Sequence, residues 1–284
     1  MTTQEDGEAQ RIDESKSSPS KPTILLTNDD GVVANGLIAM KAELDRFAHV
    51  EIYAPDRNWS AASRTMTFHK PLRVEHVFLP SGGDAHMTSG SPADCVALAL
   101  MGLLEENPRL VVSGINAGIN VGQDITYSGT VSAAMEAVRS GIPTIAVSQD
   151  VSQDGRGRTA FDVAARFTAG LARFLLEHPV LPQGVLLNVN IPANVGSAVP
   201  EVRLTRQGGE AHSNHLVRGR DPRGREFYWI AGELMTGGSA GQEGTDIWAV
   251  ANGYISVTPI HLDMTDYSLL ETLSSVENLA WADE

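Results

Sequence analysis

Short apolar runs alternate with amphipathic segments from Thr23 onward, and this alternation constrains the fold more than any other feature. Residues 23–27 form a buried-type run, and residues 36–47 carry apolar side chains at helical spacing. The pattern predicts further strands at residues 50–54, 110–113, 144–148 and 185–191, and helices at residues 92–104, 129–140 and 160–177. Strands that alternate with helices form parallel sheets covered on both faces. We therefore expect an α/β fold with a Rossmann-like, doubly wound and mostly parallel sheet.

The pattern changes after Pro200, where predicted strands lie among Gly, Arg and Asp loops. Strands are expected at residues 201–206, 227–230 and 253–259, as β-hairpins and extensions of the sheet. Residues 266–281 carry apolar side chains at helical spacing, and this apolar stripe needs a core or a partner subunit to cover it. The stripe consists of Leu269, Leu270, Leu273, Val276 and Leu279. The expected organisation is a disordered tail (1–21), a catalytic core (22–199), a hairpin extension (200–265) that completes the sheet and forms an assembly interface, and a C-terminal helix (266–284).

Charge and composition exclude several classes of protein. The net charge of −14 disfavours binding along a nucleic-acid backbone, which relies on clustered Lys and Arg. The longest apolar run, residues 96–104, contains Gly102 and is shorter than the roughly 20 residues that span a bilayer. The acidic N-terminus lacks the features of a secretory signal, and the single cysteine, Cys95, forms no internal disulfide. We expect a cytoplasmic protein that binds neither membranes nor nucleic-acid polymers.

Oxygen-bearing side chains follow three of the predicted strands. Asp29 and Asp30 follow the first strand, the loop 54–63 contains Ser60, and the Gly- and Asn-rich loop 114–122 contains Asn116 and Asn120. Because strand ends in such sheets form a crevice, these side chains are candidates for one site. Oxygen ligands without Cys or His suit Mg²⁺, Mn²⁺ or Ca²⁺. The alternative for the two aspartates is an Asn/Asp/Gly turn whose side chains bond the local backbone.

A hydroxyl-rich turn precedes the helix predicted from residue 129. Ser128, Gly129 and Thr130 stand at its start. The first turn of a helix presents unpaired N–H groups and partial positive charge, which favour phosphate binding. The alternative is a simple N-cap by Ser128 or Thr130.

These segments, in this order, resemble the SurE family of stationary-phase survival nucleotidases. The resemblance runs from about residue 22 to residue 267. It is carried by residues 27–31, 54–63, 89–95, 113–122 and 127–136, and by the Asp-Pro-Arg-Gly-Arg run at 221–225 ahead of the aromatic residues 227–229. The sequence departs from the family pattern at Asn35, Ala61 and Ala137, which are not expected ligands.

The resemblance implies one divalent cation per subunit, Mg²⁺ or Mn²⁺, with Ca²⁺ as a substitute in crystals. Its implied ligands are Asp29, Asp30, Ser60 and Asn116, and the implied phosphate contacts are Asn116, Asn120, Ser128, Gly129 and Thr130. It also implies hydrolysis of nucleoside 5′- and 3′-monophosphates, and of short polyphosphate in some members. Subunits of the family form homodimers that exchange C-terminal segments, or homotetramers joined through an extended hairpin.

Asp29 and Asp30 are the predicted catalytic residues, and either of them could transfer the proton. A phosphatase with an aspartyl-phosphate intermediate has two aspartates separated by one position, whereas these two are adjacent. A non-catalytic metal or nucleotide sensor is the alternative from another class. His212 and His215 are interpreted as part of an exposed loop, and Arg223 and Arg225 as interface residues. Trp59 and Tyr127 are candidates for stacking on a base or for packing of the site wall.

Overall fold

The computed structural model describes residues 21–151, 161–193, 200–234 and 241–279, with the side chains of 212–214 and 233–234 excepted. The predicted tail, apart from Lys21, and residues 280–284 lie outside this part. The strands are β1 (Thr23–Thr27), β2 (His49–Pro55), β3 (Val74–Phe78), β4 (Asp84–Thr88), β5 (Leu110–Ala117), β6 (Thr144–Gln149), β7 (Val185–Ile191), β8 (Val202–Leu204), β9 (His212–Arg220), β10 (Glu226–Leu234) and β11 (Ile255–His261). The α-helices are α1 (Asn35–Leu44), α2 (Pro92–Leu98), α3 (Gly129–Arg139), α4 (Asp162–Glu177), α5 (Asp246–Ala251) and α6 (Tyr267–Thr272).

Nine of the described strands form one mixed sheet in the order β3-β4-β2-β1-β5-β6-β7-β11-β8. The six strands from β4 to β7 in this order are parallel, while β3 and β11 run antiparallel to their inner neighbours. The chain leaves β1 toward β2 and later returns to the other side of β1 as β5. The predicted doubly wound, mostly parallel sheet is confirmed, and its switch point lies beside β1.

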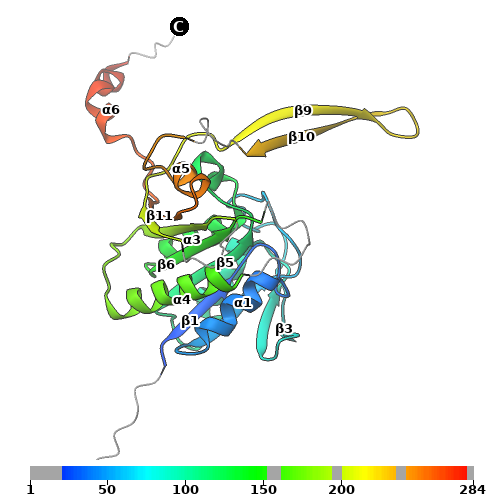
Figure 1. Cartoon of the computed structure of the whole chain (residues 1–284), viewed down its shortest axis with the longest axis vertical. Coiled ribbons are helices and arrows are strands. Elements are labelled where there is room, and N and C mark those ends of the chain that lie inside the picture. The colour runs from blue at the N-terminus through cyan, green and yellow to red at the C-terminus, as the bar shows by residue number, and fades with distance from the viewer. Residues whose placement is uncertain (1–20, 152–160, 194–199, 235–240, 280–284) are drawn as a thin grey trace, which may run out of the picture.

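Helices cover both faces of the sheet (Figure 1), and β1 shows how the sequence directs them. Ile24 and Leu26 pack in a core cluster with residues of α1 and α4. Leu25, which points to the other face, packs with residues of α2 and α3. A strand buried on both sides has no polar alternation, and this explains why residues 23–27 are continuously apolar or Thr.

Several predicted boundaries are confirmed and others need correction. The predicted strands at 23–27 and 185–191 agree with β1 and β7. The helix expected to reach residue 47 ends at Leu44, and the one expected over 92–104 ends at Leu98 and continues as a π-helix, η1 (Ala99–Leu103). The strand predicted at 110–113 extends to Ala117 across a bulge, so Asn116 lies in β5 and not in a loop.

Two elements extend away from the sheet (Figure 1). Among the described strands, β9 and β10 pair with each other only, as an antiparallel hairpin. The interpretation of His212 and His215 as loop residues was therefore wrong, because both lie in β9. The C-terminal arm (residues 263–279) is not one helix over 266–281, since α6 ends at Thr272 and a 3₁₀ helix, η4 (Ser274–Asn278), follows. With no core beneath it, a short helix has little to stabilise it.

Candidate active site

The site begins at the sharp turn after β1. The Asn28 side chain is fully buried, donates to the Gly31 carbonyl at 3.0 Å and accepts the Gly31 N–H at 3.2 Å. These bonds close the turn in the manner expected of Asn. The local-turn interpretation thus applies to Asn28, whereas the side chains of Asp29 and Asp30 bond to residues far away in the sequence.

Asp29 packs against the start of α3. Asp29 is 3% exposed, and its carboxylate accepts a 2.5 Å hydrogen bond from the Thr130 hydroxyl. A Cβ added to Gly129 would lie 2.7 Å from Asp29 Oδ2, so only glycine permits this approach. Burial raises the pKa of Asp29 to about 6; the charge of Asp30 acts in the same direction, and hydrogen bonds from Thr130 oppose it.

Asp30 connects the two strands that flank β1. Its Oδ1 accepts from the Asn58 side chain at 2.9 Å, and its Oδ2 accepts from the Ala117 N–H at 3.3 Å. Asn58 follows β2, and Ala117 is the last residue of β5. Burial raises the pKa of Asp30 as well, against these two hydrogen bonds. The ends of β1, β2 and β5 therefore meet at Asp30.

The other two predicted metal ligands neighbour these contacts in the chain. Ser60 is exposed, and its N–H donates to Asn58 Oδ1 at 2.8 Å. The preceding N–H, of Trp59, donates to the Asp29 carbonyl at 2.8 Å. Asn116 is half-buried and precedes Ala117; its amide nitrogen donates to the Gly118 carbonyl at 2.8 Å, which leaves its carbonyl oxygen for another partner. The four residues come from three strand ends that hydrogen bonds hold together.

The side chains predicted to contact phosphate have partners within the protein. Ser128 caps α3 by accepting the Val131 N–H at 3.1 Å, as the N-cap interpretation expected. The Thr130 hydroxyl is fully buried and donates to Asp29. The Asn120 amide nitrogen donates to Ser148 Oγ at 2.7 Å. Gly129 has no side chain, and it would contact an anion through its backbone N–H.

Sequence reasoning missed several residues that support the site. Asn190 accepts the Asn120 N–H at 2.8 Å and donates to the Asn120 carbonyl at 2.9 Å, and Asn188 donates to the same carbonyl at 2.8 Å. Two asparagines, two positions apart within the otherwise apolar strand β7, were the available signal. No such signal marked Asn58, which bonds to Asp30, because polar residues are common in loops.

The donor set suits a hard divalent cation. Among the described residues, neither Asp29 nor Asp30 forms an ion pair with Lys, Arg or His, so two neighbouring carboxylates have no positive partner. The described part of the chain also contains no metal-type group of three His, Cys, Asp or Glu residues. A cation at the two aspartates would therefore take neutral oxygens as further ligands, which is the chemistry of Ser60 and Asn116.

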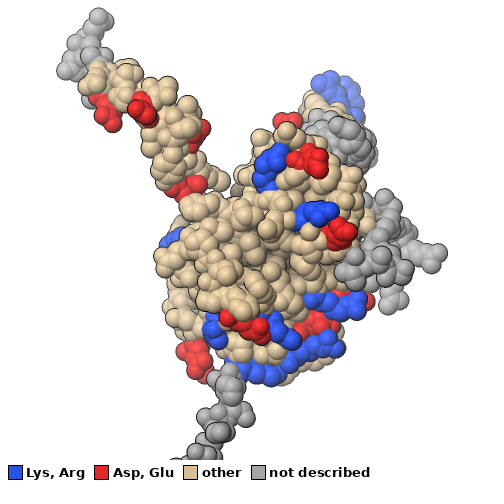
Figure 2. Space-filling model, turned by 60° about the vertical axis from the view of Figure 1, so that its left-hand side comes forward, with Lys and Arg blue, Asp and Glu red and all other residues tan. Residues whose placement is uncertain are grey.

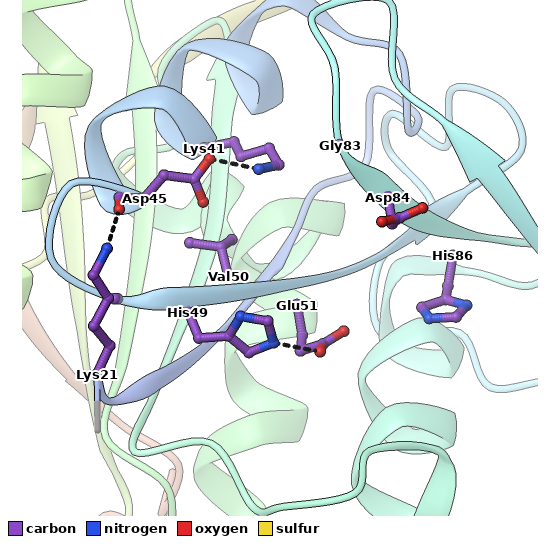
Figure 3. A pocket seen from close by; sticks show the side chains of 10 residues that line it. Lys21, Lys41, Asp45, His49, Val50, Glu51, Gly83, Asp84 and His86 are labelled. Carbon is purple, nitrogen blue, oxygen red and sulfur yellow. Dashed lines mark hydrogen bonds and ion pairs between the residues drawn. The ribbon is translucent and has the colours of Figure 1, made fainter. Parts of the chain in front are cut away.

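A separate pocket lies where strands β2 and β4 begin (Figure 3). Its lining includes Lys41 and Asp45 at the end of α1 and His49 at the start of β2. Because β1 and β2 are parallel, the start of β2 is remote from the turn after β1 that carries Asp29. Lys41 is paired with Asp45 and His49 with Glu51, so the pocket has mixed charge and is not the candidate site.

On the face shown in Figure 2, Lys and Arg side chains of the described residues lie among Asp and Glu side chains. None of the helices in the described ranges has the length and apolar character needed to cross a lipid bilayer.

Comparisons with known proteins find a matching family and a matching fold. The family described as Survival protein SurE matches residues 24–214. A protein of Herpetosiphon aurantiacus named 5′-nucleotidase SurE is 46% identical over 253 residues, which cover 89% of this chain and 97% of that protein. The protein of the same name from Aquifex aeolicus is 42% identical, over 90% of this chain and 99% of its own length. A crystal structure of the Aquifex aeolicus SurE protein superposes with a TM-score of 0.77 at 41% identity, covering 90% of this chain and all of that one.

Proposed function

Because the chain belongs to the SurE family of survival proteins, we propose that it is a divalent-metal-dependent phosphatase that hydrolyses nucleoside 5′-monophosphates to a nucleoside and phosphate. One observation supports the proposal most strongly. Asp29 and Asp30, without a basic partner among the described residues, lie where the ends of β1, β2 and β5 meet the first turn of α3. In open α/β sheets, ligands bind at this kind of switch point.

We propose Asp29, Asp30, Ser60 and Asn116 as the residues that hold one cation, Mg²⁺ or Mn²⁺. When bound, such an ion polarises phosphoryl oxygens and favours ionisation of an attacking water. The protein groups have separate tasks. Thr130 and Gly129 fix the Asp29 carboxylate, while Asn58 and the Ala117 N–H fix that of Asp30. Preorganised groups of this kind lower the barrier because they need not reorient during the reaction.

The substrate phosphate is proposed to bind between Asn116 and the first turn of α3. Because Ser128 and Thr130 use their hydroxyls within the protein, we assign this contact mainly to the backbone around Gly129. Asn120, held by Ser148 and Asn190, would then support the loop beside the phosphate. Either Asp29 or Asp30 is proposed to accept the proton of the attacking water.

Broader activities are included in the proposal on the basis of the family resemblance alone. These are hydrolysis of nucleoside 3′-monophosphates and of short polyphosphate. The cytoplasmic location also stays a prediction, because a single cysteine agrees with a reducing compartment. A homodimer or homotetramer is supported by the apolar side chains exposed on the C-terminal arm and on the β9–β10 hairpin, which include Leu273 and Trp229.

A phosphate-release assay tests the central proposal. Nucleoside 5′- and 3′-monophosphates and a short polyphosphate are incubated with Mg²⁺, Mn²⁺ or a chelator, beside the variants Asp29→Asn and Asp30→Asn. We expect metal-dependent release of phosphate from the 5′-monophosphates, and a loss of at least about a hundredfold in either variant, because each removes a charged ligand. A sensor would bind nucleotide and release nothing, and wild-type rates in both variants would contradict the proposed site.

A further inference from the structure

We propose that Asp94, acting through Thr67, is a positioning residue for Ser60, and this inference rests on the proposed function. These three residues belong to two segments. Ser60 and Thr67 lie in the connection between β2 and β3 (the β2–β3 loop, residues 56–73), which contains no helix or strand. Asp94 lies in the first turn of α2.

The β2–β3 loop has a conformation that its own sequence does not favour. Ala61, which directly follows Ser60, and Ser63 have φ values of 57° and 55°. Residues other than glycine adopt such positive values rarely. Contacts with the rest of the protein must therefore impose this conformation on the segment that carries Ser60.

One set of contacts fixes the loop beside the site. The Trp59 N–H donates to the Asp29 carbonyl at 2.8 Å. The Ser63 N–H donates to the Tyr127 carbonyl at 3.0 Å, and the Ser63 hydroxyl donates to the Thr126 carbonyl at 2.8 Å. Ser60 is thus held between the turn after β1 and the segment that leads into α3.

A second set of contacts fixes the same loop to α2. The Thr67 N–H donates to Asp94 Oδ1 at 2.9 Å, and the Thr67 hydroxyl donates to Asp94 Oδ2 at 2.7 Å. The Ser91 hydroxyl donates to the Thr65 carbonyl at 2.5 Å. Asp94 is 1% exposed, and among the described residues it pairs with no Lys, Arg or His. A buried carboxylate that accepts both donors of one loop residue holds it firmly.

The residues of α2 that hold the loop, Ser91 and Asp94, are themselves fixed in place. Ser91 and Asp94 form the capping box of α2, in which the Ser91 N–H donates to Asp94 Oδ2 at 2.9 Å. Cys95 and Val96, the next residues of α2, are fully buried in the core against the sheet. The core therefore fixes α2, and α2 fixes the β2–β3 loop at Thr67. The loop in turn fixes Ser60 through the strained residues Ala61 and Ser63.

The test uses Thr67→Val, which removes the hydroxyl at nearly constant shape, and Thr67→Ser, which retains it. Thr168→Val is the matched control, because the buried Thr168 hydroxyl on α4 has no hydrogen-bond partner within the described ranges. Mn²⁺ affinity is measured from the EPR signal of free Mn²⁺, without substrate. We expect Thr67→Val to weaken Mn²⁺ binding about tenfold, as loss of an indirect support of a ligand typically does, while Thr67→Ser and Thr168→Val bind like wild type.

Kinetics separate positioning from a general structural effect. For Thr67→Val, the Mn²⁺ concentration for half-maximal activation should rise by the same factor, with kcat at saturating Mn²⁺ within about twofold of wild type. Asp94→Asn should show a larger change in the same direction. Wild-type Mn²⁺ affinity in Thr67→Val, or equal losses in Thr67→Ser, would overturn the inference while the wild-type enzyme stays active. If the wild type neither binds Mn²⁺ nor releases phosphate, the proposed function fails, and the inference fails with it.

Discussion

A buried aspartate without a positive partner lowers the stability of a protein whenever the carboxylate is ionised. Asp29 has no such partner in the part of the chain that the structure describes, and burial raises its pKa from 3.8 to about 6. The folded state then holds the proton more tightly than the unfolded state, so stability falls as pH rises from about 4 to about 6 and is constant above that window.

The first prediction concerns Asp29→Asn in chelator-treated protein. Because the amide carries no charge, this variant should be more stable than wild type above pH 6, by up to about 3 kcal/mol for a shift of roughly two pKa units. The advantage should shrink steadily toward pH 4. Urea unfolding between pH 4 and pH 8 measures it, and a difference that is independent of pH would show that Asp29 does not titrate in this way.

Asp29 also shows which part of the site the sequence alone could predict. The order of polar residues at the strand ends indicated a site for a cation at Asp29 and Asp30. It did not indicate that Thr130, 101 residues away, donates its hydroxyl to Asp29. Thr130 appeared instead as a phosphate contact, because a local motif does not reveal which long-range partner a hydroxyl has.

At the scale of elements, the start of α3 and the turn after β1 fit together through Gly129. The second prediction is that Gly129→Ala forces these two elements apart, because the new methyl group would lie 2.7 Å from both Cβ and Oδ2 of Asp29. Overpacking of this kind costs about 1–3 kcal/mol. Metal-dependent activity should fall by about tenfold or more, since Asp29 would shift.

Gly170→Ala is the matched control for this variant. Gly170 lies within α4, and a methyl group there would meet no atom of the described residues within 4 Å beyond its own stretch of helix. It should raise stability by up to about 1 kcal/mol, the ordinary gain of alanine over glycine in a helix, and leave activity unchanged. Thermal unfolding and the phosphate-release assay measure both effects. Equal activity of the two variants would contradict close packing at Gly129.

The elements that the sequence predicted well are those buried on both faces. Strands β1 and β7 are continuous apolar runs within the core, and their predicted bounds agree with the structure. Strand β9 was missed because its side chains from His215 onward are mostly exposed, so no apolar run marks it. Antiparallel pairing with β10 defines β9, and the pairing of an exposed hairpin leaves no apolar periodicity in the sequence.

At the scale of the whole molecule, the exposed apolar side chains of the C-terminal arm predict self-association. Leu269, Leu270 and Leu273 are 47%, 57% and 53% exposed. The third prediction is that Leu270→Asp with Leu273→Asp lowers the mass of the assembly in sedimentation experiments, because the charges cannot be buried against a partner subunit. Glu271→Gln on the same arm is the control and should associate like wild type. An assembly unaffected by the double variant would contradict a role of the arm.

The adjacency of Asp29 and Asp30 has a consequence for how the two wings of the sheet are joined. Asn58 belongs to the wing that begins with β2, and Ala117 to the wing that begins with β5; both bond to Asp30, while Asp29 bonds to Thr130 in the second wing. An ion held by both aspartates would thus lie between the two wings and crosslink them. Removal of the ion by a chelator should then increase amide hydrogen exchange in both wings together. Exchange in the β9–β10 hairpin should not change.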